Sequence, residues 1–197
     1  MVAVGAMAIS SELRRPCSLM RARRASQRSV FSGFHYQVVN DSETVLADLT
    51  WPNYAQARNA RLKWHKPGSP DGDLKIEMPQ GIYRIGFEFL TRAYANDVRF
   101  LLQQGDDVLA MAEVLFPKDG IKRHEIFLRH PLAGRLVRAN RWARVRYLLE
   151  ADGQVIGRIE EPHWFSMKRQ LSIDLPNDMP VPLQTFLAFL VINSAFR

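Results

Sequence analysis

Apolar and polar residues alternate in short runs along most of the chain from Phe34 onward. A period of two residues is typical of β-strands that have one buried face and one face in contact with water. These runs together predict a mostly β protein. The clearest of them are residues 45–51, 73–78, 83–89, 98–103 and 170–175.

Turn-forming residues separate these runs. Asn40-Asp41-Ser42 and Gln104-Gly105-Asp106 each lie between two runs, and Asp152-Gly153 is a pair that favours a tight hairpin. Short links between successive strands indicate an antiparallel meander. About nine or ten candidate strands favour a closed barrel or a sandwich over an open sheet. Residues 53–65 fit either a short helix or a strand that ends at Trp64.

The C-terminal segment departs from this alternation. Pro180 and Pro182 precede residues 183–196, LQTFLAFLVINSAF, and proline is common in the first turn of a helix. As a helix this segment is apolar on nearly every side, and such helices are buried in protein or in a membrane. Its length of roughly 21 Å is less than the about 30 Å of a bilayer core. We therefore expect no transmembrane span, and instead a closed antiparallel β-barrel of about 10–12 strands around a buried apolar C-terminal helix.

The end of the chain resembles the tubby C-terminal-like superfamily, in particular its phospholipid scramblase and LURP-one-related branches. The resemblance lies in a hairpin, a further strand, an acidic and proline-containing link, and a final apolar helix. These are residues 147–150 and 154–160 around the turn 151–153, then 170–175, 176–180 and 183–196. It implies a 12-stranded barrel around a central helix. Some members of the superfamily bind phosphoinositide headgroups, and others are reported to move or sense phospholipids.

The chain also departs from that superfamily in several respects. The cysteine-rich palmitoylation segment of the scramblases is absent, and Asp71-Gly72-Asp73 is only a fragment of a Ca²⁺ loop that reads better as a turn. No residue aligns with the phosphoinositide-binding residues of tubby proteins, so the resemblance assigns no binding residue here.

The N-terminal residues follow neither a strand nor a helix period. Residues 1–34 hold six arginines against Glu12, which is +5 of the chain's net charge of +7. We expect residues 1–30 to form a disordered basic tail and residues 31–197 to form a single domain. An organelle transit peptide, or a true start at Met20, fits the same composition. Because Cys17 is the only cysteine, no intramolecular disulfide can form, which favours a cytoplasmic location, including the periphery of a membrane.

One basic segment dominates the rest of the chain. Residues 121–146 contain eight lysines and arginines against Glu125, a composition that favours an anionic partner or a solvated surface. On a strand, Trp142, Arg144 and Arg146 share the outer face, whereas Ala143, Val145 and Tyr147 point inward. Arginine forks bind phosphate oxygens, and tryptophan is common at membrane interfaces. We therefore predict that anionic phospholipid headgroups, or a protein partner, bind at Arg138, Arg141, Trp142, Arg144 and Arg146, with Lys122, Arg123 and Arg135 extending the patch.

The sequence contains no recognisable catalytic or metal-binding motif. The five histidines form no HxxxH, HExxH or Cys/His cluster, and no P-loop or GxSxG motif occurs. We therefore predict a non-enzymatic lipid-binding or interaction module without cofactor or metal. Two alternatives stay open. One is a nucleic-acid-binding β module that uses residues 122–146, and it is disfavoured because Trp142 is nearly the only aromatic residue there. The other is an enzyme with a pocket at the barrel rim.

Overall fold

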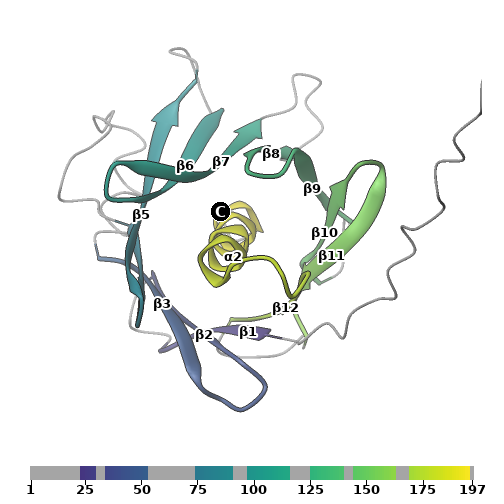
Figure 1. Cartoon of the computed structure of the whole chain (residues 1–197). Coiled ribbons are helices and arrows are strands. Elements are labelled where there is room, and N and C mark those ends of the chain that lie inside the picture. Colours follow the sequence, from purple (N-terminus) through teal and green to yellow (C-terminus); the bar gives the residue numbers. More distant parts are fainter. Residues whose placement is uncertain are drawn as a thin grey trace, which may run out of the picture.

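A computed structural model describes residues 23–29, 34–52, 74–90, 97–115, 125–139, 144–162 and 169–195. Twelve strands and one helix, α2 (Val181–Ala195), make up this described part (Figure 1). The strands are β1 (Arg23–Gln27), β2 (Phe34–Val39), β3 (Val45–Trp51), β4 (Leu74–Met78), β5 (Gly81–Phe89), β6 (Val98–Gln104), β7 (Asp107–Leu115), β8 (Glu125–His130), β9 (Gly134–Arg138), β10 (Arg146–Ala151), β11 (Gln154–Glu160) and β12 (Gln170–Asp174).

Each strand pairs antiparallel with its neighbours in sequence, and β1 pairs with β12 to close the barrel. Closure leaves no sheet edge among these strands, so their backbone groups pair within the barrel. The predicted mostly β fold, a closed antiparallel barrel with a central helix, is confirmed. The predicted hairpin at Asp152-Gly153 is also confirmed, because both residues have the positive φ angles, 51° and 73°, that such a turn requires.

The first strand corrects one expectation. Residues 1–30 were predicted to lie outside the fold, but Arg23–Gln27 forms β1 between β12 and β2. The strand has no readable hydrophobic period because Ala25, 1% exposed, is its only apolar residue. Backbone pairing with two flanking strands therefore holds β1 in place, and a domain that begins at residue 31 lacks one strand. Residues 1–22 lie outside the described part of the chain.

The helix α2 fills the barrel. Every residue from Leu183 to Ser194 is buried, and Figure 1 shows the helix inside the ring of strands. It begins two residues before the predicted 183, and residue 196 lies outside the described residues. Buried Gln184 is satisfied at the helix start, where its Nε2 donates to the backbone oxygen of Met179 at 2.8 Å. None of the described helical segments has the length and hydropathy needed to cross a bilayer.

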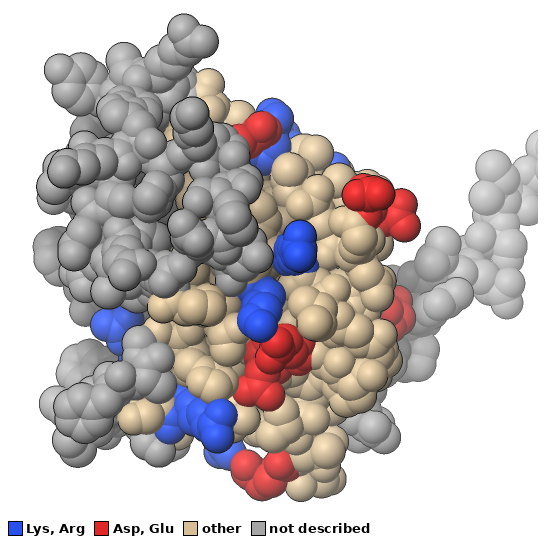
Figure 2. Space-filling model, turned by 90° about the vertical axis from the view of Figure 1, so that its left-hand side faces the viewer, with Lys and Arg blue, Asp and Glu red and all other residues tan. Residues whose placement is uncertain are grey.

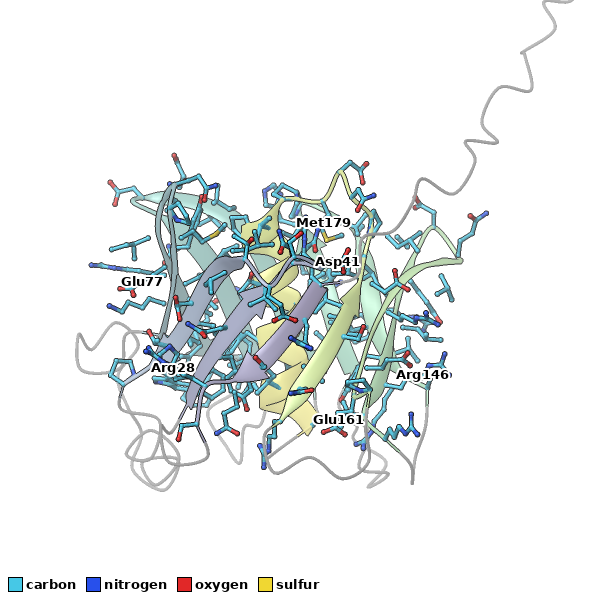
Figure 3. The ribbon with its side chains drawn as sticks, turned by 90° about the horizontal axis from the view of Figure 1, so that it is seen from below. Arg28, Asp41, Glu77, Arg146, Glu161 and Met179 are labelled. Atoms are coloured by element: carbon cyan, nitrogen blue, oxygen red, sulfur yellow. The ribbon has the colours of Figure 1, made fainter. Side chains whose placement is uncertain are left out.

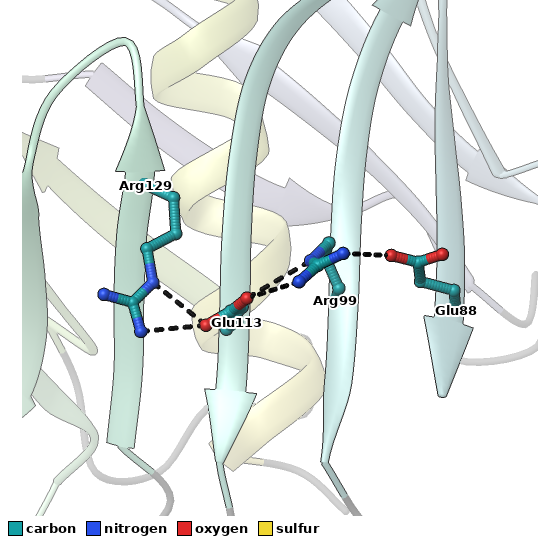
Figure 4. A network of polar contacts seen from close by, with 4 residues as sticks. All are labelled: Glu88, Arg99, Glu113 and Arg129. Atoms are coloured by element: carbon teal, nitrogen blue, oxygen red, sulfur yellow. Dashed lines mark hydrogen bonds and ion pairs between the residues drawn. The ribbon is translucent and has the colours of Figure 1, made fainter. Parts of the chain in front are cut away.

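An ion-pair network crosses four strands on the outer surface (Figure 4). Glu113 on β7 accepts hydrogen bonds from Arg99 Nη2 and Arg129 Nε, each at 2.9 Å. Arg99 also donates to Glu88 Oε1 at 2.6 Å, and these hydrogen bonds to Glu113 and Glu88 raise its pKa. Burial alone would raise the pKa of Glu113, whose side chain is only 12% exposed, but the hydrogen bonds from the two arginines outweigh it and lower that pKa.

Replacing Glu113 with glutamine is expected to lower the free energy of unfolding at pH 7 by about 1 kcal/mol. Because folding lowers the pKa of Glu113, its carboxylate stabilises the fold above the unfolded pKa of about 4.3, and this contribution disappears as the pH falls through the folded pKa. Urea unfolding at pH 7, 5 and 3 should show that the parent and Glu113→Gln differ in free energy of unfolding at pH 7 and 5, and that this difference disappears only at pH 3. Glu77→Gln, which breaks the more exposed pair with Lys75, serves as the control, with a smaller expected loss. A difference in free energy of unfolding that is equal at all three pH values would contradict a stabilising role of the Glu113 carboxylate.

Candidate anion-binding surface

The two ends of the barrel are built from different links. In an antiparallel meander, successive links lie at alternate ends of the barrel. One end, here called the hairpin end, therefore holds the segment before α2 and the turns after β2, β4, β6, β8 and β10. The links after β1, β3, β5, β7, β9 and β11 share the other, here called the link end. In Figure 3, Asp41 and Met179 lie at the hairpin end, whereas Arg28 and Glu161 lie at the link end.

The hairpin end is acidic. Its links are residues 40–44, 79–80, 105–106, 131–133, 152–153 and 175–180, all of them described, and they contain five acidic residues but no lysine or arginine. An anionic surface therefore repels this end of the barrel. The acidic residues are Asp41, Glu43, Asp106, Asp152 and Asp178.

The link end is far less acidic. Its described link residues contain Arg28, Arg144 and Arg169 against Asp97 and Glu161, and Arg138 ends β9 at the same end. By sequence alone, the six stretches between the described strand ends here contain ten lysines and arginines against three aspartates. These stretches lie outside the described part of the structure. They are residues 30–33, 53–73, 91–96, 116–124, 140–143 and 163–168.

The face over β3–β5 shows no such imbalance. Basic and acidic side chains are interspersed among the coloured residues of this face in Figure 2, and Lys75 Nζ lies 2.6 Å from Glu77 Oε1 on β4.

Three of the five predicted binding residues are described, and they lie near one another. Arg138 ends β9, while Arg144 and Arg146 stand just before and at the start of β10. The Ala139 amide donates to the Arg146 backbone oxygen at 2.9 Å, which joins the two strands at this point. Arg141 and Trp142 lie outside the described residues.

The predicted division of residues 142–147 into two faces is confirmed for 144–147, the part of this segment that the structure describes. Val145 and Tyr147 are 6% and 1% exposed, whereas Arg144 is exposed to solvent. Burial raises the pKa of Tyr147, so this phenol stays neutral over the physiological pH range.

Arg146 differs from its two neighbours because a carboxylate compensates its charge. Its Nε lies 3.0 Å from Glu160 Oε2 on β11. Arg135, which the sequence suggested as an extension of the patch, is likewise paired, with 2.8 Å between its Nε and Glu150 Oε2. The sequence interpretation missed both pairs, because the strand register that brings the partners together is not visible in one sequence.

Arg138 and Arg144 are the remaining charges of the predicted set. No described carboxylate forms an ion pair with either guanidinium, and Arg144 Nη1 donates to the backbone oxygen of Pro162 at 3.2 Å. The register places Arg138 on the face of Tyr147, whereas Arg144 is exposed on the other side. Each guanidinium therefore offers its own fork of donors to phosphate oxygens. Within the described residues, no group of three or more His, Cys, Asp or Glu is arranged to hold a metal ion.

Comparisons with known proteins find no family model, no curated protein and no solved structure that matches this chain.

Proposed function

We propose that this protein is a tubby-like barrel that docks reversibly on anionic phospholipid headgroups through its link end. The observation that carries the proposal is the charge difference between the two ends, together with Arg138 and Arg144, which pair with no carboxylate among the described residues. An anionic leaflet attracts each nearby basic side chain by about 1 kcal/mol and repels acidic groups within a Debye length of about 10 Å. The barrel therefore approaches such a surface with its acidic hairpin end pointing away.

The fold agrees with this proposal in a second respect. A barrel of twelve described strands that encloses an apolar C-terminal helix is what the resemblance to the phospholipid-binding superfamily implied. Because α2 occupies the interior, a lipid headgroup has to bind on the outer surface or at an end of the barrel rather than inside it.

Charge reversal of Arg144 tests the proposal directly. Arg144→Glu removes one positive charge and adds a negative one, so binding to vesicles that contain phosphatidylserine or phosphoinositide is expected to fall about tenfold or more. Co-sedimentation at low and physiological salt measures the change, and neutral vesicles provide the baseline. Arg138→Glu is expected to behave in the same way.

Two controls make the result specific. Arg84→Glu makes the same change in net charge at an exposed position on β5, and it should lose less binding than Arg144→Glu. The experiment uses the full chain, since β1 belongs to the barrel, with Arg14, Arg15 and Arg21 replaced by glutamine in every protein compared. Equal losses for the Arg84 and Arg144 variants, or no binding by the parent protein at low salt, would sink the proposal. Thermal melting followed by circular dichroism confirms that each variant is folded.

A further inference from the structure

A pocket of about 340 Å³ lies on the barrel near β1, β12 and the turn between β2 and β3. Arg24 and Ser172 are register partners, and each stands next to a buried residue on its strand, Ala25 and Ile173 respectively. The pocket therefore opens on the outer face of these strands, away from the core. Its volume is within the range of small-molecule sites. The residues that line it include Arg23, Arg24, Asp41, Glu43, Gln170 and Ser172.

Glu43 occupies an unusual position in this pocket. Its φ of 58° lies in the left-handed region, which side chains other than glycine and asparagine rarely adopt. The side chain of Asn40 fixes the surrounding turn, because its Oδ1 accepts hydrogen bonds from the backbone amides of Ser42 and Thr44. Glycine would adopt this backbone conformation with less strain than glutamate. What glutamate adds at position 43 is therefore its carboxylate. Strained backbone of this kind is concentrated at ligand sites and switches.

The carboxylate of Glu43 is held against Arg24. Arg24 Nη2 donates to both carboxylate oxygens, at 2.6 and 2.7 Å, although the two side chains are 43% and 69% exposed. A pair this exposed is weak because water competes for both partners. A ligand that offers Arg24 a better acceptor therefore has only a weak contact to displace.

The charges of the pocket indicate the class of ligand. Two arginines and two acidic residues line the pocket, and Arg24 is paired with Glu43. A purely anionic ligand on Arg24 would leave the Glu43 carboxylate without a counter-ion. A zwitterion satisfies both. The Ser172 hydroxyl and Gln170 amide add donors beyond those that a carboxylate needs, which favours the three oxygens of a phosphate. The described lining offers carboxylates for a cation, and these suit the three hydrogen-bond donors of a primary ammonium group better than a quaternary one, which has none.

We propose that this pocket binds a small zwitterion in which a phosphate ester and a primary ammonium group lie a few bonds apart, free in solution or as a lipid headgroup. The phosphate takes the place of the Glu43 carboxylate on Arg24. The released carboxylate, together with Asp41, then accepts hydrogen bonds from the ammonium group. The site uses none of Arg138, Arg144 and Arg146, but it reaches the link end at Pro162, whose backbone oxygen accepts a hydrogen bond from Arg144.

Calorimetric titration of the full chain with phosphoethanolamine tests the proposal, with inorganic phosphate, ethylamine and phosphocholine as comparison probes. Phosphoethanolamine is expected to bind at least tenfold more tightly than any of the three. Arg24→Gln and Glu43→Gln should each weaken this binding at least tenfold. Glu43→Gly should do the same while melting at least as high as the parent, which separates loss of the site from loss of the fold.

Arg135→Gln removes an arginine from a comparable ion pair outside the pocket, and it should leave the affinity unchanged. Equal affinities for phosphate and phosphoethanolamine, no measurable binding, or full affinity in Arg24→Gln would each overturn the proposal. Flotation with phosphatidylethanolamine in neutral vesicles identifies the source, since binding there indicates a lipid headgroup and binding of the soluble probe alone indicates a free compound. Arg138→Glu should not affect either readout, so the failure of this site and the failure of anionic docking are distinguishable.

Discussion

Replacing Phe189 with alanine is expected to lower the free energy of unfolding by about 3–5 kcal/mol. Phe189 is fully buried on α2, and its ring lies 5.3 Å from that of Phe100 and 6.0 Å from that of Phe34. The substitution removes contacts to strands on different sides of the helix and leaves a cavity that the closed barrel cannot readily fill. Urea unfolding of the full chain, followed by circular dichroism, measures the change.

The matching control is Val155→Ala. Val155 is 57% exposed on β11, so its truncation is expected to change the free energy of unfolding by no more than about 0.5 kcal/mol. If Phe189→Ala leaves too little folded protein to measure, Phe189→Leu should still fold and be destabilised by a smaller amount. A loss for Phe189→Ala as small as that for Val155→Ala would contradict a central role of α2 in the core.

The barrel and its helix could be predicted because both follow from hydrophobic pattern. Residues such as Ile76, Tyr83 and Ile85 are buried where the two-residue period places them. The helix could be recognised because an unbroken apolar segment too short to span a bilayer needs a protein shell on every side. Twelve antiparallel strands that close into a ring supply that shell.

β1 could not be predicted because its pairing with β2 and β12 is not visible in its own sequence. The sequence RRASQ offers one small inward residue, Ala25, and a hydrophobic period needs more than one. The need for a strand between β2 and β12 arises only when the barrel closes. Closure is a property of the whole sheet, and no local stretch of sequence encodes it.

The burial of individual residues near the candidate site was predictable, but their charge balance was not. Alternation over residues 144–147 correctly places Arg144 outside and Tyr147 inside. Which arginines keep an uncompensated charge depends on the register between strands, and this register places Glu160 opposite Arg146. The strained Glu43 also escapes sequence analysis, because a glutamate in a polar turn gives no sign of its positive φ.

The two proposed sites place different demands on the same barrel. Docking of the link end depends on summed positive charge and should weaken steadily with salt. The pocket beside β1 and β12 contains balanced charges, so its affinity should respond less to salt and more to the spacing of the two charged groups in the ligand. Comparing the salt dependence of vesicle binding with that of phosphoethanolamine binding therefore separates the two sites without any substitution.

Alanine at position 157 is expected to destabilise the protein by about 1–3 kcal/mol. A Cβ atom on Gly157 in β11 would lie 2.8 Å from the backbone oxygen of Asp174 and 2.7 Å from Leu175 Cδ2. Backbone at this point cannot shift freely, since Leu175 is 1% exposed and leads from β12 towards α2. The substitution therefore pushes apart the two strands that set the direction of the central helix.

Gly86→Ala provides the matched comparison, again by urea unfolding of the full chain. Gly86 also lies within a strand, β5, but its added Cβ would meet only the side-chain oxygen of Gln103, at an ordinary distance of 3.5 Å. Because alanine restricts the unfolded chain more than glycine does, this variant should be as stable as the parent or slightly more stable. Equal stability of the two variants would mean that β11 and β12 can separate at no cost, and the close approach at Gly157 would then have no part in positioning α2.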